Sequence, residues 1–200
     1  MQLSAGFIGA LPVNRLFLAF FLLAWATLGA AQSDVRICYG YGCLVQVDIH
    51  IEEARWQVLG RQLRLAVNAE NEREILAGVV GQFYAWAAEQ SPVGNDRGGN
   101  YADAGVHGAM DCIDHSTSTT NLLRELERRQ LLRWHQVLPR MLRARFFVFE
   151  HYSAAIAERV AAPGVVEPSR YAVDSWFVDN GKPAVILPLE DWMNGAGPDV

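Results

Sequence analysis

The hydrophobic pattern of residues 72–90 is typical of an amphipathic helix. Apolar side chains recur there at three- and four-residue spacings, which places them on one helical face and predicts that this face packs into a core. Residues 52–65 and 116–132 also have a composition that favours helix. We therefore expect three helices in the first two thirds of the chain.

Several other segments have the pattern of strands. Residues 44–51 alternate in part between apolar and polar side chains, as a half-buried strand does. Residues 134–142 contain a central proline, which restricts a strand there to a sheet edge or a bulge. Residues 145–158 and 170–178 are expected to form two further strands, and residues 183–189 a final edge strand.

The first 31 residues have the organisation of a secretory signal peptide. Arg15 is their one charge, and the apolar run 16–28 that follows has 13 residues. A membrane-spanning helix needs about 20 apolar residues, so this run is too short to be a typical span. Gly29 and Ala31 suit the −3 and −1 positions of a cleavage site, which predicts cleavage after Ala31.

Cleavage would leave residues 32–200 as a single domain. Loss of Arg15 changes the formal charge from −5 to −6, since 16 basic residues then face 22 acidic ones. An acidic chain without a basic stripe is a poor candidate for binding nucleic acid. We expect an exported protein, periplasmic or secreted. The alternative is an inner-membrane anchor formed by residues 16–31, because residues 7–13 are also apolar.

Export would allow the cysteines to form disulfides, because exported proteins meet oxidising conditions. The chain has three cysteines, and Cys38 and Cys43 bracket a Tyr-Gly-Tyr-Gly segment that lets the backbone turn back on itself. We expect a local disulfide between them, which leaves Cys112 free. The alternative pairs Cys112 with either of the other two. No second ligand pair follows at a spacing that would hold zinc, so we expect no metal or cofactor.

Cys112 directly follows a residue suited to start a helix. Asp111 is a good N-cap, and Asp114 falls in the first turn. The positive end of the helix dipole would favour a thiolate at Cys112. The alternative is an ordinary buried cysteine. A metal site formed by Asp111, Asp114 and His115 is a weaker alternative, because acids at helix starts are more often caps.

A histidine and an acid follow Cys112 on the two predicted strands. If residues 145–158 and 170–178 form a hairpin in which opposed residue numbers sum to 325, His151 lies opposite Asp174 and on the same face. The long connecting loop does not fix this register, and a slip of one residue would turn Asp174 to the other face. A thiol, a histidine and an acid in this order form a nucleophile, base and orienter set.

Three short motifs carry a family resemblance. Residues 110–114 read Met-Asp-Cys-Ile-Asp, residues 151–156 read His-Tyr-Ser-Ala-Ala-Ile, and residues 171–176 read Tyr-Ala-Val-Asp-Ser-Trp. They resemble the Cys, His and Asp motifs of the transglutaminase-like, papain-related cysteine peptidase superfamily, especially its bacterial exported branch. The resemblance covers about residues 95–180, and residues 38–90 match no motif.

The resemblance implies an α+β fold in which N-terminal helices pack on an antiparallel sheet. It implies that Cys112 is the nucleophile, His151 the base and Asp174 the orienter. The expected activity is thiol-dependent acyl transfer on peptide or isopeptide amides, with peptides, proteins or peptidoglycan-type amides as substrates. Neither nucleic acid nor a cofactor is an expected partner, and membrane contact is expected only if the signal segment is retained.

The sequence does not identify which groups would form the oxyanion hole of the expected site. Candidates for the oxyanion-hole donors are Asn100, His107 and the backbone N–H of Cys112. Without such donors the chain would be a catalytically inactive binding or cell-envelope assembly domain, which is the alternative function. His107, His115 and His135 have no evident acid partner in the sequence, and we expect them to be ordinary histidines.

Overall fold

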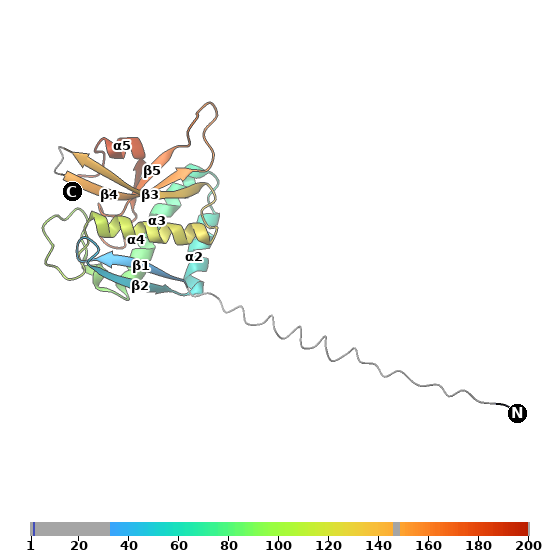
Figure 1. The fold of residues 1–200 in the computed structure, drawn as a ribbon, viewed down its shortest axis with the longest axis horizontal. Coiled ribbons are helices and arrows are strands. Elements are labelled where there is room, and N and C mark those ends of the chain that lie inside the picture. The colour runs from blue at the N-terminus through green and yellow to red at the C-terminus, as the bar shows by residue number, and fades with distance from the viewer. Residues whose placement is uncertain (1, 3–32, 146–148, 200) are drawn as a thin grey trace. The chain divides into compact units, whose positions relative to one another are not determined.

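The computed structural model of the protein describes residue 2, residues 33–145 and residues 149–199. Residues Gln32–Val200 form one compact unit (Figure 1). Apart from Gln2, the predicted signal peptide and its alternative as an anchor lie outside the described residues. Among the helices that the structure describes, none combines the length and apolar character needed to cross a membrane.

The fold is α+β, with helices and two antiparallel sheets, as expected. The smaller sheet pairs β1 (Ser33–Tyr39) with β2 (Val45–Ile51). The larger has the order β3-β4-β5-β6, and every neighbouring pair is antiparallel. Its strands are β3 (His135–Arg145), β4 (Phe149–Glu158), β5 (Arg170–Asp174) and β6 (Val185–Pro188). The strand β1 was not among the predicted strands.

The three predicted long helices are present with shifted ends. Asn68 caps α3 with its side chain, so this helix begins three residues before its predicted start. The helix α4 begins at Cys112 and ends four residues before residue 132. The helical elements are α2 (Glu53–Arg64), α3 (Ala69–Ala88), the 3-10 turn η1 (Pro92–Asn95), α4 (Cys112–Arg128) and α5 (Leu189–Met193).

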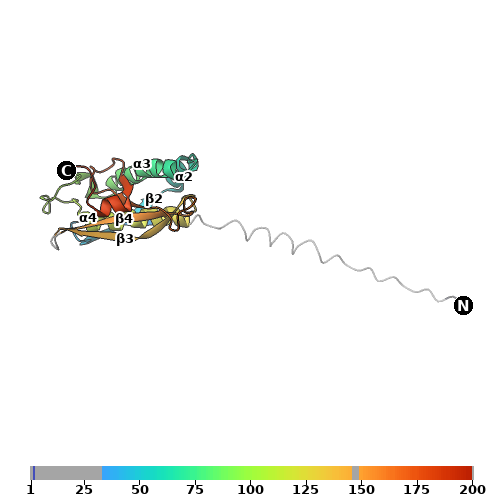
Figure 2. The same cartoon turned by 90° about the horizontal axis from the view of Figure 1, so that it is seen from above.

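The helix α4 lies between the two sheets, with β1 on one side and β3 and β4 on the other (Figure 1). Figure 2 shows α2 and α3 together on one side of the unit. The main core joins apolar side chains of α3, α4 and both sheets, including Phe83, Leu122 and Ile156. The small residues after His151 allow β4 to pack closely on α4.

A smaller apolar cluster forms near the C-terminus. It contains Ala172, Trp176, Phe177, Leu189 and Trp192, and the partly buried Cys112 packs against it. The short helix α5, which was not among the predicted helices, supplies Trp192 to this cluster.

The edge strands follow the sequence prediction. The strand β3 lies at one edge of the larger sheet, and its pairing with β4 shifts register between Leu138 and Met141. Pro139 lies in this bulge, where its missing N–H breaks no ladder bond. The strand β6 forms the opposite edge, as expected for residues 183–189.

The predicted hairpin register is wrong by two residues. Ala154 pairs with Val173 and Ala155 with Ala172, so opposed numbers sum to 327 rather than 325. The long loop between the strands leaves the register to side-chain packing. Because the error is an even number, His151 and Asp174 still project from the same face. The strand β5 also ends at Asp174, four residues before the predicted end.

Candidate active site

The first turn of α4 is held by a reciprocal cap. The Asp111 carboxylate accepts the backbone N–H of Asp114 at 2.8 Å, and the Asp114 carboxylate accepts the N–H of Asp111 at 3.1 Å. Cys112 is therefore the first helical residue, where a backbone N–H has no acceptor within the helix. The partly exposed Cys112 is a free thiol at the positive end of the helix dipole.

A disulfide turn packs against this helix start. Cys38 and Cys43 form the predicted local disulfide, with their Cα atoms 4.8 Å apart. All four residues from Gly40 to Cys43 have positive φ, between 61° and 85°. Successive backbone N–H groups of a turn that point to one side form a nest for anions.

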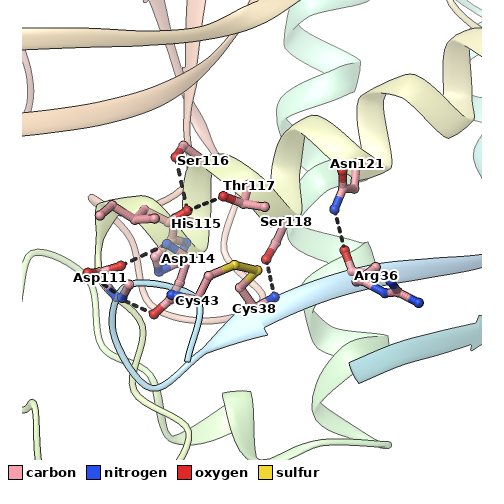
Figure 3. Close-up of a disulfide and its surroundings, with 12 residues drawn as sticks. Arg36, Cys38, Cys43, Asp111, Asp114, His115, Ser116, Thr117, Ser118 and Asn121 are labelled. Carbon is pink, nitrogen blue, oxygen red and sulfur yellow. Dashed lines mark hydrogen bonds between the residues drawn. A yellow bond between two sulfur atoms is a disulfide. The ribbon is translucent and has the colours of Figure 1, made fainter. Parts of the chain in front are cut away.

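The anions in this nest are the two capping carboxylates. The N–H groups of Tyr41 and Cys43 donate to Asp114 at 2.8 and 2.7 Å, and that of Gly42 donates to Asp111 at 2.9 Å. Figure 3 shows the disulfide beside both carboxylates. The disulfide turn is therefore a second support for the end of α4 that carries Cys112.

Asp114 lies in an environment that opposes its charge. Burial and the nearby Asp111 raise its pKa to about 6, although three backbone N–H groups favour the ionised form. The weaker metal alternative receives no support from the geometry, because the His115 ring bonds to Asp96 and Ser175 instead of joining the two carboxylates.

His151 and Asp174 are joined directly. The Nε2–H of His151 donates to Asp174 Oδ2 at 2.7 Å. Two tryptophans hold the same carboxylate: the Nε1–H of Trp192 donates to Oδ2 at 2.9 Å, and the backbone N–H of Trp176 donates to Oδ1 at 3.2 Å. Asp174 is almost fully buried, so these three donors replace the water that its carboxylate would otherwise bind.

Cys112 is the third member of the group that His151 and Asp174 form, because it interacts with His151. Burial lowers the pKa of His151, but hydrogen bonds and charge interactions with Asp174 and Cys112 raise it to about 9. The imidazole is therefore largely protonated at neutral pH. The structure brings together the three residues to which the sequence assigns the roles of nucleophile, base and orienter.

Aromatic rings surround the imidazole. The ring centroids of Trp176, Phe177 and Trp192 lie 4.9, 5.5 and 5.6 Å from that of His151. Tyr101, which is 77% exposed, packs against Trp176 with a centroid distance of 4.8 Å. The roles of Trp176 and Trp192 were missed in the sequence, because nothing there places their N–H groups near Asp174.

Two of the other histidines have acid partners that are not evident in the sequence. His115 Nε2 lies 2.9 Å from Asp96 Oδ2, and His135 Nδ1 lies 2.8 Å from Glu72 Oε1. All four side chains are buried. Each acid comes from a distant element, so sequence spacing gave no signal of the pairing.

The two side chains considered as oxyanion-hole donors, those of Asn100 and His107, make contacts with other residues. The side chain of Asn100 accepts the N–H of Ala102, and the His107 ring packs edge-on against Tyr39. No hydrogen bond joins Asn100 or His107 to Cys112 or His151 within the described part of the chain. The backbone N–H of Cys112 stays a candidate.

Comparisons with protein-family models, with curated proteins and with solved structures find no match. The resemblance to a family therefore rests on the three motifs around Cys112, His151 and Asp174.

Proposed function

We propose that the protein is an exported thiol-dependent acyl-transfer enzyme, a cysteine peptidase or amidase that acts on peptide or isopeptide amides. The observation that carries the proposal is the group formed by the free Cys112 at a helix start, His151 and Asp174. Each member has the chemistry of its role. We also propose a papain- or transglutaminase-like fold, since α4 packs on the antiparallel sheet that carries His151 and Asp174.

In the proposed reaction His151 holds the proton of the Cys112 thiol. Nε2 is bonded to Asp174, so Nδ1 is the nitrogen left for this proton. The Cys112 sulfur attacks an amide carbonyl carbon, and the backbone N–H of Cys112 faces the developing oxyanion. As the C–N bond breaks, His151 gives its proton to the leaving amine, and a thioester remains on Cys112.

The second half of the reaction regenerates the thiol. Water, or an amine of a second substrate, attacks the thioester carbonyl and loses a proton to His151. The C–S bond then breaks and the sulfur leaves with the bonding electrons. The products are a carboxylate with water, or a new amide with an amine. Proteins and peptidoglycan cross-links are the amides that an exported enzyme would meet.

The disulfide supports the proposed export, because disulfides persist in oxidising compartments. Asp174 supports the proposed chemistry: it holds the imidazole by one nitrogen, which fixes the ring orientation.

Alkylation by iodoacetamide at pH 6 tests the proposal. A free thiol with an ordinary pKa near 8.5 is about 0.3% ionised at this pH, so a thiolate paired with His151 should react about ten- to a hundredfold faster than a model thiol. His151→Ala should lose this advantage, and Cys112→Ser should remove the labelled site. A parallel assay measures new carboxylates and amines released from peptide and peptidoglycan substrates.

Labelling of Cys112 at the rate of a model thiol would refute the enzyme proposal, as would a disulfide at Cys112 in the active protein. Either result would leave the binding or envelope-assembly domain as the better description.

A further inference from the structure

A second buried polar group lies beside the proposed active site. Asp96 is fully buried, and its carboxylate has two partners on α4 and the segment before it. Oδ1 accepts the backbone N–H of Met110 at 2.7 Å, and Oδ2 lies 2.9 Å from His115 Nε2. Met110 is two residues before Cys112 and His115 three residues after it. One carboxylate therefore binds the chain on both sides of Cys112, through the backbone of Met110 and the side chain of His115.

The other end of this group reaches the residue after Asp174. His115 Nδ1 lies 2.9 Å from Ser175 Oγ, and Ser175 Oγ lies 2.9 Å from Thr119 Oγ1. His115 and Thr119 are four residues apart on one face of α4. Two side chains of the helix that carries Cys112 thus bind Ser175, the residue that follows Asp174 at the end of β5.

When the His115 ring is neutral, its two hydrogen-bond partners determine which of its nitrogens carries the proton. An ionised carboxylate can only accept hydrogen bonds, so His115 Nε2 carries a proton for Asp96. In a neutral imidazole, Nδ1 then accepts the hydroxyl proton of Ser175. Each hydrogen bond has one donor and one acceptor, which favours a single geometry for the contact.

Serine, histidine and aspartate in contact are also the components of a hydrolytic triad, but burial argues against that role here. His115 is 3% exposed, Ser175 4% and Asp96 0%. A substrate carbonyl has no access to Ser175 Oγ in this arrangement, so the group can act on the reaction only through the residues that it holds.

We propose that His115 is a positioning residue that fixes Cys112 on α4 relative to Asp174 and so to the imidazole of His151. The inference rests on the proposed function of Cys112, His151 and Asp174. Loss of the contact between His115 and Ser175 would weaken the link between the start of α4 and the end of β5, where Thr119 would be the remaining partner of Ser175 named above. The Cys112 sulfur and His151 would then spend less time in contact.

The test compares the rate of Cys112 alkylation by iodoacetamide at pH 6 and pH 10. Ser175→Ala removes one hydroxyl and leaves the pair of His115 with Asp96 intact. It should lower the rate at pH 6 about three- to tenfold, because the hydrogen bonds of this hydroxyl to His115 and Thr119 are lost. The rate at pH 10 should stay unchanged, because the thiol ionises there without help. A purely structural role would change the unfolding temperature but not the ratio of the two rates.

Two variants of His115 and one control sharpen the test. His115→Leu removes both contacts and should lower the pH 6 rate further. His115→Gln should restore at least half of the loss, because its carboxamide donates to Asp96 and accepts from Ser175. Thr120→Val is the control: this buried hydroxyl of α4 has no hydrogen-bond partner among the described residues, so its variant should behave as the wild type.

The outcomes separate this inference from the proposed function. If the wild type reacts fast at pH 6 and Ser175→Ala keeps the same ratio of rates, His115 has no positioning role while the proposed function stands. If the wild type itself reacts as a model thiol, the proposed function fails and the inference fails with it. Should His115→Leu not fold, Ser175→Ala still decides the question.

Discussion

His151 Nε2 and Asp174 Oδ2 lie 2.7 Å apart although the two residues are not opposed in the β4–β5 register. They are diagonal neighbours on one face of the sheet, a relationship within reach of long side chains. Asp174 ends β5, and the chain then turns so that the backbone N–H of Trp176 reaches the same carboxylate. The acid is therefore held by the turn after its strand as well as by the histidine.

Protonation of His151 should stabilise the fold in neutral and acidic solution. Its pKa in the folded state, about 9, is above the ordinary value of 6.5. The stability that it contributes is therefore complete below pH 6.5 and is lost as the pH rises through 9. The difference between the two values corresponds to ~3 kcal/mol.

Urea unfolding of the wild type and His151→Gln between pH 6 and pH 10 measures this contribution. The free-energy difference between the two proteins should be largest at pH 6 and should fall toward pH 10. A constant difference over that range would show that the imidazole gains nothing from Asp174 and Cys112.

The indole N–H of Trp192 should stabilise the Asp174 carboxylate. Trp192→Phe keeps an aromatic ring but leaves Oδ2 with one donor fewer, and a hydrogen bond to a charged group contributes ~1.5–3 kcal/mol. Trp56→Phe is a matched control, because Trp56 is also buried and its Nε1 has no hydrogen-bond partner in the part of the chain that the structure describes.

Thermal and urea unfolding of both variants should show that Trp192→Phe costs more stability than Trp56→Phe by about 1.5 kcal/mol or more. The Trp192 variant should also slow Cys112 alkylation at pH 6, and the control should not. Equal losses in the two variants would mean that the indole N–H contributes nothing to the site.

Much of the fold followed from local patterns in the sequence. The cap at Asp111, the proline bulge in β3 and the Cys38–Cys43 disulfide depend on residues close together in the chain, so their physics is local. The common face of His151 and Asp174 followed from strand alternation, although the assumed register was wrong. A register error of two residues leaves each side chain on the same face of the sheet, so His151 and Asp174 still meet.

The contacts that support the candidate site were beyond sequence reasoning. Asp96 meets His115 across 19 residues and Trp192 meets Asp174 across 18, through elements whose relative placement depends on the whole core. No periodicity relates a loop acid to a helix histidine. The same holds for the disulfide turn, whose N–H groups were not expected to bind the cap of α4.

Reduction of the disulfide should destabilise the protein. Closure of a loop as short as that between Cys38 and Cys43 contributes ~2 kcal/mol in the chain-entropy model, and the turn also binds the carboxylates at the start of α4. Dithiothreitol should lower the unfolding temperature of the wild type by several degrees. The double variant Cys38→Ser, Cys43→Ser should already unfold at the lower temperature and should not respond to the reductant.

A thiol titration in denaturant provides the control for that experiment. Before reduction the wild type should show the single free thiol of Cys112, since the other two cysteines are paired. An unfolding temperature that does not change when the two further thiols appear would mean that the disulfide does not support the helix start.

Ionisation of Asp114 should cost stability as the pH rises. Its pKa in the folded state is about 6, above the ordinary 3.8, because burial and Asp111 oppose the charge. A raised carboxyl pKa means that the folded state prefers the protonated acid, so stability falls as the pH rises from 3.8 through 6. The difference of the two values corresponds to ~3 kcal/mol.

Asp114→Asn replaces the acid with a neutral group of the same shape. From pH 3.5 to pH 7 the wild type should therefore lose ~2–3 kcal/mol relative to this variant, measured by urea unfolding at each pH. Asp191→Asn, at an exposed acid in the first turn of α5, should stay parallel to the wild type. If Asp114→Asn also stays parallel, the pKa of Asp114 is the same in the folded and unfolded states, and the three N–H groups around it balance burial and Asp111.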